Sequence, residues 1–267
     1  MRSPALGYSP SVALRETSVR PAQPWLIRWE IFAVFAVSLG ASALNAILSL
    51  VQSLLAKQSL SSQQATLVGP EAANNWLDLA FQLATIAEAL APVVLVLYLL
   101  VRSGDYDKIG LDASQPGKDV ARGAVLAAVI GGVGLAYYVV AFKLGSNLNV
   151  VPEDLPAVWW RIPVLVLYAV QNGVLEETLV IGYLLTRLEQ LQVRPWVAIV
   201  ASALLRGCYH LYQGFGPFFG NAVLGLVFGT LFRRWRRVTP FIIAHTLIDA
   251  GAFLGYAALH GKVSWLP

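Results

Sequence analysis

Seven long apolar segments, separated by short polar connections, constrain this 267-residue chain more than any other feature. They lie at about residues 25–55, 76–101, 120–142, 162–185, 195–211, 216–232 and 238–259. Each approaches or exceeds the roughly 20 residues that an α-helix needs to cross about 30 Å of hydrocarbon. Only 13% of the residues are charged, about half the fraction found in soluble proteins. The sequence therefore predicts an all-α, polytopic membrane bundle of about seven transmembrane helices, within a range of six to eight.

The basic residues predict how this bundle is oriented. They gather before the first segment and in every second connection: Arg2, Arg15, Arg20 and Arg28, then Arg102, Lys108, Lys118 and Arg122, then Arg187 and Arg194, then Arg233, Arg234, Arg236 and Arg237. Cytoplasmic loops of membrane proteins carry an excess of Lys and Arg. We therefore expect a cytoplasmic N-terminus and a C-terminus outside. The basic residues form no patch interleaved with aromatic residues, so no nucleic acid is expected as a partner.

Composition divides the chain into two parts. Residues 1–24 are rich in Ser, Pro, Ala and Arg and hold no continuous apolar stretch, which predicts a disordered cytoplasmic tail. Residues 25–267 are expected to form a single membrane domain, since no internal repeat divides them.

Polar residues inside the apolar segments indicate where a functional site lies. An ionisable side chain at the centre of a membrane helix costs about 2.5–3.5 kcal/mol by insertion scales. The fourth segment nevertheless carries Glu176 and Glu177, with Asn172 one turn before Glu176 on the same helix face. Adjacent helical residues point about 100° apart, so both carboxyl groups can border one cavity. Protonated, hydrogen-bonded acids that serve only packing are the alternative.

Two later segments add pairs of polar residues spaced four apart, so that each pair shares a helix face. The fifth segment carries Arg206 and His210, and the seventh carries His245 and Asp249. The charge of Arg206 needs an anionic partner inside the membrane, and a carboxylate of the fourth segment is the obvious one. The three segments could therefore converge on one site.

Two chemistries use such a set of residues. In the first, a carboxylate and a histidine activate water while other side chains stabilise the oxyanion, and no cofactor is required. In the second, a divalent metal such as zinc, held by His210, His245, Glu176 and Asp249, acidifies its bound water. The HExxH zinc motif is missing from the sequence. The residues alone leave both chemistries open.

At these positions the sequence resembles the CAAX-protease and bacteriocin-processing family of intramembrane peptidases, also called the Abi family, which includes the type II CAAX prenyl endopeptidases. The family has a helix with EExxxR, an aromatic-rich helix with a histidine, and HxxxN or HxxxD on a last helix. The matching residues are Glu176 and Glu177, continued by Gly182, Tyr183 and Leu184, then Tyr209 and His210, then His245 and Asp249. The resemblance covers residues 162–256, which would be the catalytic core.

The resemblance implies roles for the five ionisable residues of the motifs. Glu176 would be the general base that activates water, with His210 beside it and Glu177 in support. His245 and Asp249 would occupy the positions that stabilise the oxyanion.

One position departs from the family pattern. The arginine of EExxxR falls on Ile181 in this chain. Arg206 from the next helix, or Arg187 one to two turns further on, would have to supply the missing charge. Arg206 and Asn172 are therefore expected to support the site.

These features predict an integral membrane endopeptidase, which we expect in a bacterial cell membrane with its site opening toward the cytoplasm. Its substrate would be a membrane-associated or lipidated protein or peptide, and the lipid bilayer would be its other partner. Two alternatives belong to other classes. The chain could be a catalytically inactive family member that serves as a membrane scaffold or regulator, or it could be a proton-coupled transporter.

Overall fold

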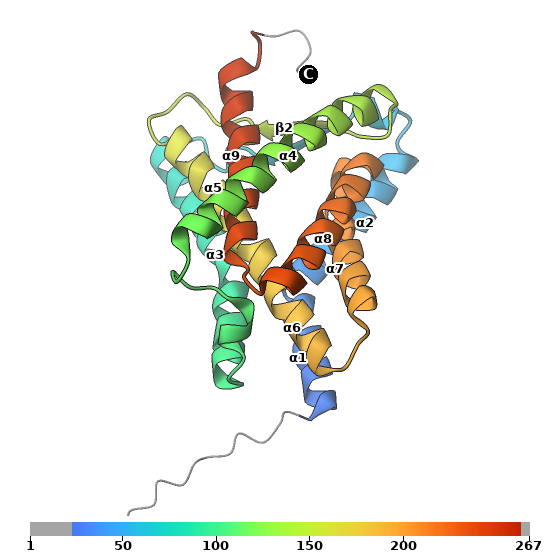
Figure 1. The fold of residues 1–267 in the computed structure, drawn as a ribbon. Helices are drawn as coiled ribbons and strands as arrows, with labels where there is room; N and C mark the ends of the chain where they lie inside the picture. The colour runs from blue at the N-terminus through green and yellow to red at the C-terminus, as the bar shows by residue number, and fades with distance from the viewer. Residues whose placement is uncertain (1–22, 263–267) are drawn as a thin grey trace, which may run out of the picture.

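The computed structural model describes residues 23–262, so nearly all of the expected tail of residues 1–24 lies outside the described residues. The helices are α1 (Pro24–Ala36), α2 (Leu39–Leu55), α3 (Asn75–Arg102), α4 (Pro116–Lys143), α5 (Arg161–Glu176), α6 (Leu184–Gln190), α7 (Pro195–Tyr209), α8 (Phe215–Trp235) and α9 (Thr239–Leu259) (Figure 1). A π-helix, Glu177–Tyr183, joins α5 to α6. These three pieces form one rod of 30 residues, Arg161–Gln190.

The helices confirm an integral membrane protein built as a polytopic bundle. Five are long and apolar enough to cross a membrane, namely α3, α4, the α5–α6 rod, α8 and α9. A sixth span is formed if α1 and α2 are taken together, although they meet at a bend of 51°. Each of the seven expected segments contains a helix. The fifth segment is short, because the 15 residues of α7 extend only about 22 Å at 1.5 Å per residue.

The first segment differs from the expected continuous helix because it is broken at residues 37–38. The hydroxyl of Ser38 donates to the carbonyl of Val34 at 2.6 Å, a local bond of the kind that bends helices. Gly40 then passes close to the preceding turn, where a Cβ would lie 2.5 Å from the carbonyl oxygen of Phe35. The bend turns α2 away from the line of α1.

Two short strands correct the all-α expectation in a minor way. Strand β1 (Gln64–Val68) pairs in parallel with β2 (Asn149–Glu153), with Gln64 opposite Asn149. We call the end of the bundle that carries this pair the strand end, and the opposite end, where α1 begins, the arginine end (Figure 1). The connections α3–α4, α6–α7 and α8–α9 all lie at the arginine end, so the basic residues of these three connections, such as Arg102, Arg194 and Arg236, share one end of the molecule.

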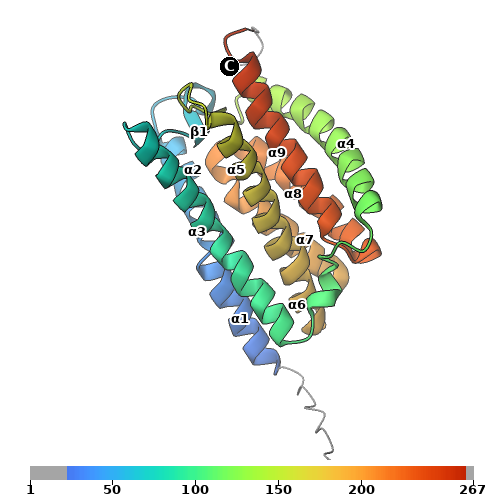
Figure 2. The same ribbon diagram turned by 90° about the vertical axis from the view of Figure 1, so that its left-hand side faces the viewer.

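The α5–α6 rod occupies the centre of the bundle. It packs against α3 on one side and α9 on the other, and α4 covers α9 (Figure 2). The largest hydrophobic cluster surrounds the π-helix, where Leu179, Val180, Ile181 and Tyr183 are fully buried. This apolar packing fills the half of the bundle between the π-helix and the arginine end.

Candidate active site

Three elements bring the polar residues of the sequence together near the middle of the bundle. Glu176 and Glu177 lie where α5 passes into the π-helix. Arg206 and Tyr209 lie in the last turn of α7, and His245 lies in the first half of α9. A π-helical turn is rare and is frequently found at functional sites. The carboxylate pair therefore sits at an irregularity of the central rod.

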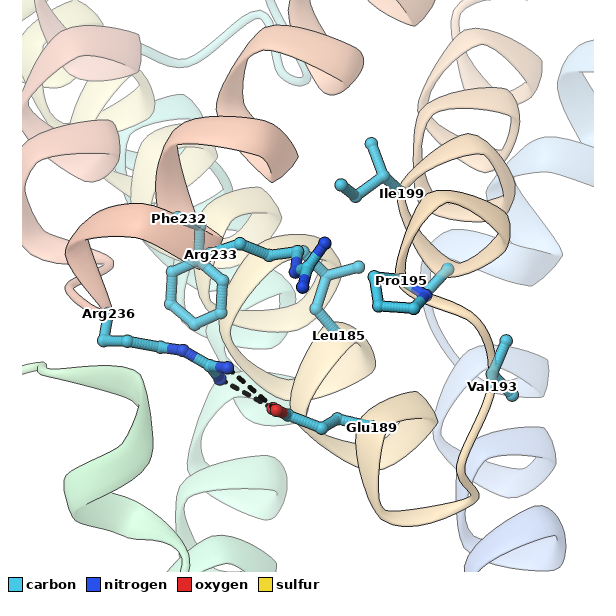
Figure 3. A pocket seen from close by; sticks show the side chains of 9 residues that line it. Leu185, Glu189, Val193, Pro195, Ile199, Phe232, Arg233 and Arg236 are labelled. Carbon is cyan, nitrogen blue, oxygen red and sulfur yellow. Dashed lines mark hydrogen bonds and ion pairs between the residues drawn. The ribbon is translucent and has the colours of Figure 1, made fainter.

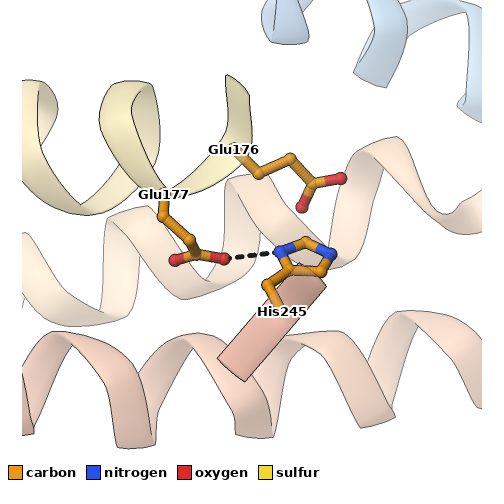
Figure 4. A group of neighbouring side chains, drawn as sticks. All are labelled: Glu176, Glu177 and His245. Carbon is orange, nitrogen blue, oxygen red and sulfur yellow. Dashed lines mark hydrogen bonds and ion pairs between the residues drawn. The ribbon is translucent and has the colours of Figure 1, made fainter. Parts of the chain in front are cut away.

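Glu177 is the centre of the site. It is fully buried, and its Oε1 accepts a hydrogen bond from Arg206 Nη2 at 2.7 Å. The same oxygen accepts a second hydrogen bond from His245 Nδ1, also at 2.7 Å (Figure 4). Arg206 is also fully buried, and its Nη1 lies 3.4 Å from Glu176 Oε2. The expected pairing of Arg206 with the carboxylates of the fourth segment is thus confirmed. The guanidinium neutralises a charge that could not remain unpaired in this environment.

Glu176 differs from Glu177 in its partner and its exposure. Its Oε2 accepts a hydrogen bond from the Tyr209 hydroxyl at 2.6 Å. Its side chain keeps 12% of its surface exposed, whereas that of Glu177 keeps none. Glu176 is therefore the carboxylate of the pair that a small molecule such as water can reach. Tyr209 was not predicted as a site residue, although its place three residues after Arg206 on one helix was a usable signal.

Asp249 and Asn172 extend the site toward the strand end. His245 Nε2 lies 3.6 Å from Asp249 Oδ1, and Asn172 Nδ2 donates to Asp249 Oδ2 at 2.9 Å. These contacts require α5 and α9 to pack closely. Gly173 permits it, since a Cβ at this position would lie 2.6 Å from the Thr246 hydroxyl oxygen and 2.9 Å from the Ile242 carbonyl oxygen.

His210 follows α7 directly and is held by the backbone. Its Nδ1 lies 2.9 Å from the carbonyl oxygen of Arg206, and its ring lies against that of Tyr209 with 4.8 Å between centroids. A carbonyl oxygen only accepts hydrogen bonds, so Nδ1 carries the proton. In a neutral ring, Nε2 is then an acceptor. No hydrogen bond among residues 23–262 joins His210 to either glutamate.

The set of possible metal ligands that the structure brings together differs from the set that the sequence predicted. Glu176, Glu177 and His245 offer ligand atoms that all lie within 4.8 Å of one another (Figure 4), whereas the sequence predicted His210 and Asp249 in place of Glu177. The group does not suit a metal ion, because the guanidinium of Arg206 already contacts both carboxylates. A second cation there would meet the repulsion of a fixed positive charge.

Arg187, the other residue considered for the missing charge, lies elsewhere. Its guanidinium binds Glu30 at 2.6 Å and Asp105 at 2.9 Å near the arginine end, so it cannot replace the family arginine. A small pocket between α6, α7 and α8 also lies at that end, beside the ion pair of Arg236 with Glu189 (Figure 3). Apolar side chains such as Ile199 line its wall. Neither Glu176 nor Glu177 lines this pocket.

Comparison with protein families bears on the segment that holds this site. Residues 158–251 match the family model described as type II CAAX prenyl endopeptidase, Rce1-like. The matched segment confirms the resemblance expected over residues 162–256. It contains every residue of the site, from Asn172 to Asp249, while α1 to α4 lie outside it. No curated protein and no solved structure matches the chain.

The Rce1-like match supports membrane protease activity in general. Proteases of this family are hydrolases, and a membrane protease acts on protein or peptide substrates at the bilayer. The match assigns neither a catalytic type nor catalytic residues to this chain.

Proposed function

We propose that this protein is an intramembrane endopeptidase that hydrolyses a peptide bond of a membrane-associated or lipidated protein, with Glu176 as the general base. The observation that carries the proposal is the buried chain from Arg206 through Glu177 to His245, with Glu176 at its accessible edge. Burying this many ionisable groups in a membrane helix bundle is costly, which favours a functional role over packing alone.

The contacts of Glu176 suit a general base. The hydroxyl of Tyr209 occupies Oε2, which fixes the carboxylate and leaves Oε1 for a water molecule. Glu176 would take a proton from that water as the oxygen attacks the carbonyl carbon. When the C–N bond breaks, the same proton would pass from Glu176 to the leaving amine. Glu177 and Arg206 would position the base and would not touch the substrate.

The opposite wall of the site suits the oxyanion. His245 is fixed by its Nδ1 bond to Glu177, so that Nε2 faces Asp249 and the space above Glu176. Hydrogen-bond donors held in a water-poor site stabilise a developing oxyanion more strongly than they would in water. We assign this role to His245 and Asp249, in which case the His245 ring must carry a proton on both nitrogens and Asp249 must be protonated, so that each can donate.

We also propose that no metal takes part, because Arg206 neutralises the carboxylates that would bind it. The activity of the Asp249→Asn variant distinguishes the glutamate mechanism from a metal mechanism. An amide donates to an oxyanion without needing a proton, so the change should be mild in the glutamate mechanism. It should be harmful if Asp249 ligates a metal, since a neutral amide is a poorer ligand.

The test is cleavage by purified protein in lipid vesicles, with a library of lipidated and unlipidated fluorescence-quenched peptides as the probe. Glu176→Gln should lower turnover by about 10²–10⁴-fold, the usual contribution of a general base. Glu189→Gln is the matched control, because Glu189 pairs with Arg236 away from the site. A chelator should leave turnover unchanged. Wild-type turnover in Glu176→Gln would refute the mechanism.

A second function is favoured by one observation. Ile181 stands where the family pattern has arginine, and it is fully buried in the apolar core. A catalytically inactive scaffold would tolerate this change. If wild-type protein cleaves no peptide of the library although it is folded, the scaffold replaces the peptidase.

A further inference from the structure

Helix α2 has three distinct faces, and one of them is unusual for a membrane helix. Ala43, Ala46 and Leu50 are buried on the face that packs against α7. Leu44, Leu48, Val51 and Leu55 form an exposed apolar face that suits lipid. The third face carries Ser42, Asn45, Ser49 and Gln52, spaced three to four apart and all exposed. None of these four side chains has a hydrogen-bond partner within residues 23–262.

Helix α3 contributes a carboxylate to the same region. Glu88 is exposed and lies near the middle of this 28-residue helix, roughly 20 Å from either end at 1.5 Å per residue. Leu99, three turns further along α3, lies on the same flank as Glu88. Leu99 packs against the hydrophobic cluster that includes Val34 of α1 and Leu39 of α2. Leu79, on the opposite flank, packs in the cluster of α5. Glu88 therefore lies on the flank of α3 opposite the one that packs in the cluster of α5.

The bend at residues 37–38 sets α2 at 51° to α1. On the side of the bend toward the arginine end, α1 packs against α3. On the side toward the strand end, α2 packs against α7 and the 211–213 turn. Figure 1 shows α2 and α3 on opposite sides of the strand end. The 211–213 turn directly follows His210, so α2 packs beside a turn that adjoins the candidate site, and its polar face begins near the bend.

Exposure around the site differs between its two ends. Toward the arginine end, Leu179 and Val180 are fully buried. Toward the strand end, Asn172 and His210 are partly exposed, and the side chain of Asp249 keeps 22% of its surface exposed. Under the orientation that the basic residues predict, the arginine end would be cytoplasmic and this side of the site would face outward. The accessible side of the site is the strand end.

We propose that the polar face of α2 and the Glu88 flank of α3 form a water-filled entrance at the strand end, which admits an extended, basic segment of the substrate to Glu176. Unpaired hydroxyl and amide groups in hydrocarbon would each cost free energy, and an isolated carboxylate would cost more. Water removes both costs. An extended peptide brings backbone groups that can bond to Ser, Asn and Gln, and a Lys or Arg would be attracted by Glu88.

This proposal rests on the proposed peptidase function for its substrate, but its geometry is testable without catalysis. The sole cysteine is first removed as Cys208→Ala. Single cysteines are then placed at Ser49 on the polar face and at Val51 on the lipid face, and are labelled with a membrane-impermeant methanethiosulfonate. Ser49→Cys should react at least about tenfold faster, since thiols in hydrocarbon do not ionise to the reactive thiolate.

Sidedness is measured in intact cells and in inverted vesicles. Lys57→Cys, in the exposed connection at the strand end, and Lys118→Cys, exposed at the arginine end, report which side the reagent reaches. Ser49→Cys should be labelled from the same side as Lys57→Cys. Equal reactivity of Ser49→Cys and Val51→Cys, or labelling from the Lys118 side, overturns the proposal whether or not the protein cleaves peptides.

The role of Glu88 is tested by reagent charge. A Ser42→Cys thiol, next to the bend, should react faster with an ammonium-bearing methanethiosulfonate than with a sulfonate-bearing one. A carboxylate lining the same entrance attracts the ammonium and repels the sulfonate, and a preference of about fivefold would correspond to about 1 kcal/mol. Glu88→Gln should abolish this preference. If the preference survives Glu88→Gln, the carboxylate does not line the entrance and a basic substrate segment is not selected there.

Discussion

Replacing Arg206 by methionine tests whether the buried ion pair with Glu177 holds the site together. Both side chains are fully enclosed, and Arg206 Nη2 lies 2.7 Å from Glu177 Oε1. Methionine fills much of the same volume without the charge. The change leaves a buried carboxylate without its cation, which typically destabilises a protein by about 3–5 kcal/mol. We expect Glu177→Gln to destabilise less, because Glu176 remains 3.4 Å from Arg206.

The double variant gives the magnitude of the pair itself. When both charges are removed, neither partner is left uncompensated, so the combined cost should fall below the sum of the single costs. Residues in direct ionic contact show interaction energies of about 0.5–3 kcal/mol, and the short distance and full burial place this pair in the upper part of that range. The free energy of unfolding is measured by detergent titration in mixed micelles.

Arg234→Met is the control, because Arg234 is exposed and has no ion pair within residues 23–262. It should change the free energy of unfolding by less than about 0.5 kcal/mol. If Arg206→Met and Glu177→Gln add within about 0.5 kcal/mol in the double variant, the two side chains are not coupled. The arrangement of the site described above would then be wrong.

Two further predictions concern packing and charge. Gly173→Ala should destabilise the protein by about 1–3 kcal/mol and lower peptidase activity, because its Cβ would meet the Ile242 carbonyl at 2.9 Å; Gly132→Ala, with open space around it, should not destabilise. Burial raises the pKa of Asp105, but hydrogen bonds led by that from Lys108 outweigh it and lower the pKa to about 2. Asp105 therefore stabilises the fold fully above its unfolded pKa of about 4, and this contribution is lost as the pH falls toward 2. The melting temperature of Asp105→Asn should accordingly lie below that of wild type at pH 7 and approach it in acid, whereas the exposed Asp107→Asn should match wild type at both pH values.

The sequence predicted the helices and much of the site because a membrane restricts both. Backbone groups in hydrocarbon must bond internally, so long apolar segments have to be helices. Ionisable side chains in those segments are too costly to be incidental, so Glu177, Arg206 and His245 could be expected to meet. Spacing alone placed Arg206 and His210 on one face, but it could not show that α7 ends at Tyr209 and that His210 bonds to backbone.

The missed features depend on tertiary packing, which leaves weak local signals. The π-helix of residues 177–183 contains no proline, and its one glycine is ordinary in a membrane helix. The break at residues 37–38 follows from one serine hydroxyl and one close glycine contact, and Ser and Gly also occur within intact membrane helices. The pairing of β1 with β2 joins segments more than 80 residues apart, so no window of sequence could contain it.

The site shows how a change in one helix can be compensated by another. A buried glutamate pair needs a cation, and the family pattern supplies it from the same helix, one turn after the pair. In this chain that position is Ile181, which is enclosed by apolar side chains, so a charge there would have to be buried in an apolar cluster. Arg206 reaches both carboxylates from α7 instead, and Gly225 of α8 lets α7 pack closely, since a Cβ there would lie 2.8 Å from Ala203 Cα. The charge balance of the pair is therefore kept although the motif is not. Installing arginine by Ile181→Arg should consequently destabilise the core and should not raise activity.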